Sequence, residues 1–179
     1  MGLDTVELII TIEKYFDIHF KDDDIKNISK VGEIADLVAD YLLITNNDQT
    51  EFNVVFSLLK SHWNSDLKLH ELISTYLALD NRTDFEKTLG LKIPPHSIER
   101  LNLLKKIFNY YLFEWNQLTI EQFINAIMIA NKEHFFTQKI SKTRYGIYIE
   151  VSRIIHHRLG APIYDIQPLS SITKDLRID

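Results

Sequence analysis

The stretch Leu3-Asp4-Thr5-Val6-Glu7-Leu8 begins the part of the chain that decides its fold. From here to Phe16, apolar residues recur every three or four positions, and charged or hydroxyl-bearing residues fill the opposite face. This period predicts an amphipathic helix over residues 3–16, with one face in a core and the other in water. The predicted buried face comprises Leu3, Val6, Ile9, Ile10, Ile12 and Phe16.

A second helix is predicted to begin at Val31 and to run to about Leu42, after the acidic turn Asp22-Asp23-Asp24. Ser29 is expected to be its N-cap, because a serine hydroxyl accepts hydrogen bonds from the free N–H groups of a first turn. The polar run 45–50 that follows is predicted to be a linker.

The rest of the chain is also predicted to be helical. Thr119 with Gln122 forms the signature of a capping box, and Gly160 suits the left-handed residue that ends a helix. No segment sustains the apolar–polar alternation of a half-buried strand, so the predicted fold class is all-α. The other predicted helices cover residues 51–63, 66–79, 97–112 and 145–158, and one more starts at Thr119.

Composition and charge exclude several classes of function. The 179 residues include no cysteine, which excludes disulfides, thiolate metal sites and cysteine nucleophiles. No apolar run approaches the roughly 20 residues of a membrane span, and no signal peptide is visible, so the expected location is the cytoplasm. The net charge is −5, and residues 1–43 carry 10 acids against 4 bases. Basic proteins are therefore expected partners, and nucleic acids and membranes are not.

Placed one after the other, residues 151–179 and 2–43 resemble a single acyl carrier protein. The helix ending at Arg158-Leu159-Gly160 resembles the first helix of that family, and residues 171–179 resemble the loop that leads to its Asp-Ser-Leu motif. Residues 3–8 then continue that motif. The resemblance implies an acyl-carrier-like four-helix bundle built from both chain ends. Residues 1–43 and 142–179 would form this first domain, and residues 44–141 a second helical one.

The order of these parts is circularly permuted relative to the family. Gly2 then occupies the position of the serine that carries 4'-phosphopantetheine, and glycine has no hydroxyl with which to form a phosphodiester. The resemblance therefore implies that this half is not phosphopantetheinylated and binds no cofactor. It also implies that the helix over 3–16 meets protein partners with basic surfaces through Asp4, Glu7, Glu13 and Asp17.

Part of the middle of the chain resembles a second carrier domain, which would be a tandem repeat of the first. His96-Ser97-Ile98 resembles the His-Ser-Leu motif of peptidyl carriers, which makes Ser97 a candidate for attachment of 4'-phosphopantetheine. Leu89-Gly90 lies too far from Ser97 for the spacing of the family. The alternative is that Ser97 is the N-cap of a helix that begins after Pro94-Pro95.

Three functions are left open by the sequence. The first is a serine-less, acyl-carrier-like protein that acts through protein–protein contacts, and the second is a working acyl or peptidyl carrier loaded at Ser97. The third is a permuted scaffold, natural or engineered, that holds no ligand. No enzymatic activity is expected, because no nucleophile–base pair and no set of metal ligands is visible. Close chain ends would also permit a domain-swapped homo-oligomer.

Overall fold

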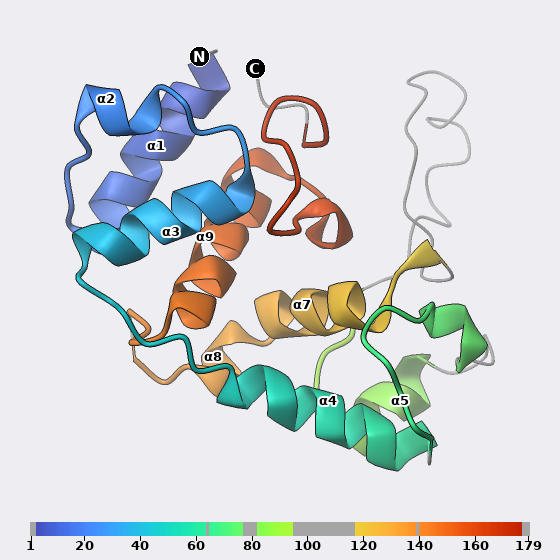
Figure 1. The fold of residues 1–179 in the computed structure, drawn as a ribbon. Coiled ribbons are helices and arrows are strands. Elements are labelled where there is room, and N and C mark those ends of the chain that lie inside the picture. The colour runs from blue at the N-terminus through green and yellow to red at the C-terminus, as the bar shows by residue number, and fades with distance from the viewer. Residues whose placement is uncertain (1–2, 64, 77–81, 95–116, 139, 177–179) are drawn as a thin grey trace, which may run out of the picture.

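Helices make up the regular secondary structure of the residues that the computed structural model describes, which are 3–63, 65–76, 82–94, 117–138 and 140–176 (Figure 1). Two isolated β-bridges and no strand occur in these ranges, so the predicted all-α fold class is confirmed. In chain order the helices are α1 (Leu3–Phe16), α2 (Asp22–Ile25), α3 (Val31–Tyr41), α4 (Thr50–Trp63), η1 (Ile73–Thr75), α5 (Arg82–Leu89), α7 (Ile120–Ala130), α8 (Lys132–Phe135), α9 (Arg144–Leu159) and η3 (Ile163–Asp165).

Helix α9 lies at the centre of this arrangement, with α1, α3 and α7 packed against it (Figure 1). Every residue from Gly146 to Ser152 is buried. About two turns of α9 therefore have no solvent-exposed face. The Thr143 hydroxyl accepts a hydrogen bond from the Gly146 N–H at 3.0 Å and caps the first turn. Gly160 adopts φ 69° at the C-terminal end, and a left-handed residue there stops the helix as predicted.

The head segment, residues 3–42, is joined to the tail segment, residues 140–176, by backbone hydrogen bonds as well as by helix packing. Val31 donates its N–H to the Ser170 carbonyl at 3.1 Å, and Ile172 donates to the Ser29 carbonyl at 2.9 Å. Figure 1 shows the start of α3 beside the loop that follows η3. The tail segment therefore holds the N-terminal end of α3 in a fixed place.

Helix α1 buries a narrower face than its period predicted. Its buried side chains include Leu8, Ile9, Ile12 and Phe16. Val6 and Ile10 were expected in the core, but they are 40% and 42% exposed, so that prediction was wrong for both. The physical reason is that α1 packs against α9 as an outer helix and buries only the stripe that faces the core, which includes Leu8.

The cap of α3 is also different from the predicted one. Lys30 is the N-cap residue, and the Ser29 hydroxyl donates to Glu33 Oε2 at 3.3 Å. Glu33 takes over this role, because its Oε2 accepts the N–H groups of Ser29 at 2.8 Å and Lys30 at 3.0 Å. The Ser29 N–H is the largest cause that lowers the pKa of Glu33 below its ordinary value. A carboxylate in a first turn also suits the positive end of the helix dipole.

Helix α7 begins as predicted, with a complete capping box. The Thr119 hydroxyl accepts the Gln122 N–H at 3.3 Å, and Gln122 Oε1 accepts the Thr119 N–H at 3.0 Å. The buried residues of this helix include the five that its period predicted, namely Ile120, Phe123, Ile124, Ile127 and Met128. The helix predicted over 51–63 is confirmed as α4.

The helix predicted over residues 66–79 is wrong in its described part, residues 66–76. This stretch forms turns, a bridge and the short helix η1 instead. Ile73 donates its N–H to the Leu118 carbonyl and Ile120 donates to the Glu71 carbonyl, both at 2.9 Å. Pairing with the chain ahead of α7 thus replaces the hydrogen bonds of a helix. The sequence also gave no prediction for α5. The predicted helix over 97–112 lies outside the described residues.

No helix in the described ranges combines the length and the apolar character that crossing a membrane requires.

Candidate functional site

Asp4 and Glu7, two of the four acidic residues predicted to meet a partner, lie on the exposed face of α1. Glu7 Oε2 is 3.7 Å from Arg158 Nη2 on α9, and both side chains are about half exposed. Val6 and Ile10 are exposed on the same helix. The free surface of α1 therefore combines negative charge with apolar side chains.

Glu13 and Asp17 are placed differently from these two. The Glu13 side chain is only 16% exposed, and its Oε1 lies 3.0 Å from His19 Nδ1. The same oxygen accepts the Phe20 N–H at 2.8 Å, so Glu13 holds the turn after α1. Asp17 is exposed within that turn and has a positive φ of 56°. The four predicted residues thus divide into two on the free face of α1 and two at its end.

Ser97 lies outside the described residues, but the segment that leads toward it is anchored. Leu91 and Ile93 are buried, and the side-chain amide of Asn131 brackets Lys92 between them. Asn131 Oδ1 accepts the Lys92 N–H at 2.8 Å, and Asn131 Nδ2 donates to the Lys92 carbonyl at 2.7 Å. Tyr164 then donates its hydroxyl to the Pro94 carbonyl at 2.5 Å. The chain is therefore fixed to the residue that ends α7 and to η3, five and three residues ahead of Ser97.

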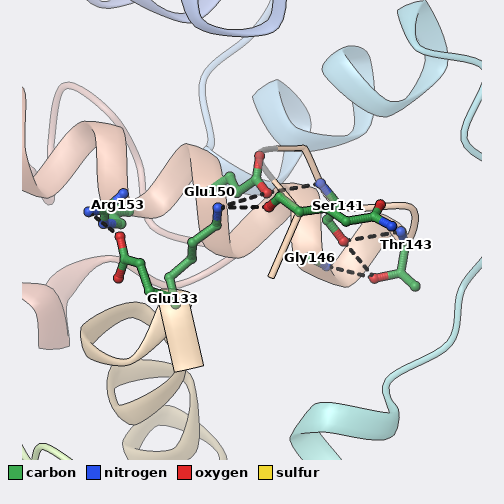
Figure 2. Close-up of polar contacts among 8 residues, drawn as sticks. Glu133, Ser141, Thr143, Gly146, Glu150 and Arg153 are labelled. Atoms are coloured by element: carbon green, nitrogen blue, oxygen red, sulfur yellow. Dashed lines mark hydrogen bonds and ion pairs between the residues drawn. The ribbon is translucent and has the colours of Figure 1, made fainter. Parts of the chain in front are cut away.

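A buried ion pair that the sequence analysis missed joins α8 to α9 (Figure 2). Glu150 is 2% exposed, and its Oε1 lies 3.5 Å from Lys132 Nζ, which is buried as well. The same oxygen accepts the Ser141 N–H at 2.9 Å, and Lys132 Nζ donates to the Gln138 carbonyl at 3.3 Å. The pair thus ties the connector 136–143 to α8 at Gln138 and to α9 at Ser141.

The environment of Glu150 changes its proton affinity. Burial raises the pKa of this carboxyl to about 7, although Lys132 and the Ser141 N–H both act to lower it. Its second oxygen, Oε2, is buried and accepts no hydrogen bond from the described residues. A buried carboxyl with one oxygen that accepts no hydrogen bond favours its neutral form, so Glu150 changes charge near neutral pH.

The contacts around Glu150 leave no spare space in the connector. A Cβ placed on Gly146 would lie 1.9 Å from Ser141 Oγ, so the loop passes directly over this glycine. Figure 2 shows Ser141 and Thr143 folded over the first turn of α9, and Arg153 directed toward Glu133. The Arg153–Glu133 ion pair, at 2.5 Å, is a second link between α9 and α8. These contacts position the protein's own elements and give the site a structural role.

Sequence reasoning could have found one member of this cluster. Glu150 stands between apolar residues in the predicted helix, from Ile147 to Val151, which marks a carboxylate forced into a core. Lys132 gave no such signal, because it lies in a stretch without a clear period. Within the described residues, no group of three or more His, Asp or Glu side chains is placed to hold a metal ion.

Comparison with protein-family models, with curated proteins and with solved structures finds no match to this chain.

Proposed function

We propose that the chain is an acyl-carrier-like protein that works through protein–protein contacts of α1, without a phosphopantetheine arm in its terminal half. The proposal is supported by the packing of α1 and α3 on α9, which joins the two chain ends that together resemble a carrier. In the order of that family, α9 would be the first helix, α1 the second, α2 a short third and α3 the fourth. Gly2, at the position of the carrier serine, has no hydroxyl for the arm.

The observation that carries the proposal is the surface of α1. One face of this helix is fixed to α9 through Leu8 and Ile12, which are fully buried. The rest of its surface presents Asp4 and Glu7, with the exposed Ile10 one turn after Glu7, and Glu7 also lies 3.7 Å from Arg158 at the edge of α9. Acidic groups around apolar side chains fit a partner with a basic rim and an apolar centre, because opposite charges steer the encounter and apolar burial supplies affinity. The compartment we propose for this contact is the cytoplasm.

Binding to a partner enzyme of carrier proteins tests this proposal. The probe is a broad-specificity phosphopantetheinyl transferase, whose affinity for the chain is measured by isothermal titration calorimetry at low salt. A variant with Asp4→Lys and Glu7→Lys should bind at least about tenfold more weakly than the wild type, because both rim charges are reversed. The matched control reverses two exposed acids of α2, Asp22→Lys with Asp23→Lys, and should bind as the wild type does. Equal losses in both variants, or no loss in either, would refute a role for α1.

A working carrier with 4'-phosphopantetheine on Ser97 is the second candidate function. It is supported by the anchoring of the preceding segment, since Tyr164 and Asn131 hold Pro94 and Lys92 in place. The third candidate, a permuted scaffold with no ligand, predicts that neither α1 nor Ser97 takes part in any binding.

A further inference from the structure

The head segment depends on the tail segment for its core. Leu8 and Ile12 of α1 and Val38 of α3 have no exposed surface, and both helices pack against α9. The partner that covers the head is therefore a helix that follows it by about a hundred residues in the chain. Contacts of this kind can form equally well with the tail segment of another copy, because every side chain involved is the same.

The linker between the head segment and α4, residues 43–49, has the properties of a hinge. Its residues lie outside any helix, and all but Ile44 are exposed. Leu43 adopts φ 55°, a left-handed conformation that is unfavourable for a residue with a branched side chain. One backbone hydrogen bond, from the Arg144 N–H to the Asn46 carbonyl at 2.8 Å, ties the linker to α9. Opening the linker at Leu43 would release this strain, at the cost of the Arg144–Asn46 bond, the 2.8 Å bond from the Ile44 N–H to the Ala39 carbonyl, and the packing of Ile44 on the core.

We propose that this protein binds a second copy of itself by exchanging head segments, so that α1 and α3 of each chain pack on α9 of the other. The closed chain and the exchanged dimer share the same head–tail contacts, and they differ in the linker and in the cost of association. A short linker holds the head at a high effective concentration, which favours the closed chain at low protein concentration. Strain at Leu43 acts against the closed chain and favours exchange. The inference is independent of the carrier-like function.

A charged contact between head and tail provides a way to detect the exchange. Arg144 of α9 pairs with two acids of α3, through Nη1 to Asp36 Oδ1 at 3.1 Å and through Nη2 to Asp40 Oδ1. A first variant, Asp36→Lys with Asp40→Lys, and a second variant, Arg144→Glu, each place like charges at this contact in a single chain. In a head-exchanged dimer of the two variants, both head–tail contacts again join opposite charges.

The experiment mixes the two variants in denaturant, refolds them together at high protein concentration, and measures the species by native mass spectrometry and light scattering. We expect a mixed dimer that exceeds the two homodimers at least about tenfold, since only this species has both contacts matched. If one variant does not fold alone, mixing should restore its helical signal together with the dimer. A mixture that contains only monomers, that contains both dimer types in random proportion, or that stays unfolded would overturn the proposal.

The matched control uses an ion pair that head exchange cannot repair. Glu133 and Arg153 form a contact of 2.5 Å, and both residues follow the linker in the chain. Glu133→Arg mixed with Arg153→Glu should give no excess of mixed dimer, and an equal excess here would overturn the assignment of the exchanged segment. A second test deletes Thr45 and Asn47 and keeps Asp48, whose Oδ1 accepts the Thr50 N–H at 3.0 Å at the start of α4. The shorter linker should strain the closed chain and raise the dimer fraction at every concentration measured, and an unchanged dimer fraction would contradict the proposal.

Discussion

Gly32, in the first turn of α3, donates its N–H to the Pro168 carbonyl at 2.9 Å and thereby fastens the head segment to the loop after η3. The approach is close because glycine has no side chain. A Cβ at this position would lie 2.8 Å from the Pro168 oxygen. The contact thus depends on one residue in each of two segments that the chain order separates widely.

Replacing Gly32 by alanine should destabilise the protein by about 1–2 kcal/mol, although alanine is the better helix former, because the added methyl pushes α3 away from the tail segment. Urea denaturation followed by circular dichroism measures the change. Lys30→Ala is the control. This side chain lies two residues before Gly32 and is exposed, so its removal should have little effect on stability. A Gly32→Ala protein as stable as the wild type would show that the head–tail junction is loose.

Stability should fall as the pH rises because of Glu150. Its pKa is raised to about 7 in the folded protein from an ordinary value of 4.5, so the folded state binds more protons than the unfolded state between these values. The contribution of Glu150 to stability is then fully present below pH 4.5 and is lost as the pH rises through 7. The full loss is about 3 kcal/mol.

The Glu150→Gln variant should lose this part of the pH dependence, because an amide has no proton to release. Free energies of unfolding measured at several pH values between 4.5 and 8 give the slope for each protein. Glu121→Gln, a change at an exposed acid of α7, is the control and should keep the slope of the wild type. The same slope in the wild type and in Glu150→Gln would contradict the buried pair as its source.

Relief of the strained C-terminal end of α3 should stabilise the protein. Leu43 is 86% exposed, and its left-handed conformation places the Ile44 N–H 2.8 Å from the Ala39 carbonyl. Glycine is the residue that this kind of helix end prefers, so Leu43→Gly should raise stability by about 1 kcal/mol and also lower the fraction of exchanged dimer.

Leu169→Gly is the matched control for that prediction. Leu169 is a similarly exposed leucine, but its φ is not positive, so glycine there brings no relief of strain. It should be neutral or slightly destabilising, because glycine adds freedom to the unfolded chain. The melting temperatures of both variants are compared with that of the wild type. A Leu43→Gly protein that melts below the wild type would show that Leu43 carries no strain.

The elements that the sequence predicted best are those whose signals are local. The capping box at Thr119, the C-terminal glycine at Gly160 and the period of α7 depend on residues a few positions apart, and all three are present. Residues 66–76 were mispredicted because their hydrogen bonds go to the chain around Leu118, which no local pattern reveals. The exposure of Val6 and Ile10 likewise depends on which side of α1 faces the core.

The candidate site shows the same limit. Exposed acids such as Asp4 could be placed on a helix face from their spacing. The inward orientation of Glu13 could not, because it depends on the Phe20 N–H in the next turn. The Glu150–Lys132 pair was out of reach for a similar reason. Its two members come from separate helices, and only the folded connector brings Ser141 to the same carboxylate.

The most direct test of the account is the intact mass of the protein after incubation with coenzyme A and a broad-specificity phosphopantetheinyl transferase. A carrier-like protein that acts through contacts of α1 should keep its mass unchanged while it still binds the transferase. A phosphopantetheine-sized increase would contradict this account. Its loss in Ser97→Ala would identify a working carrier in the middle of the chain, and its persistence would place the arm on another hydroxyl.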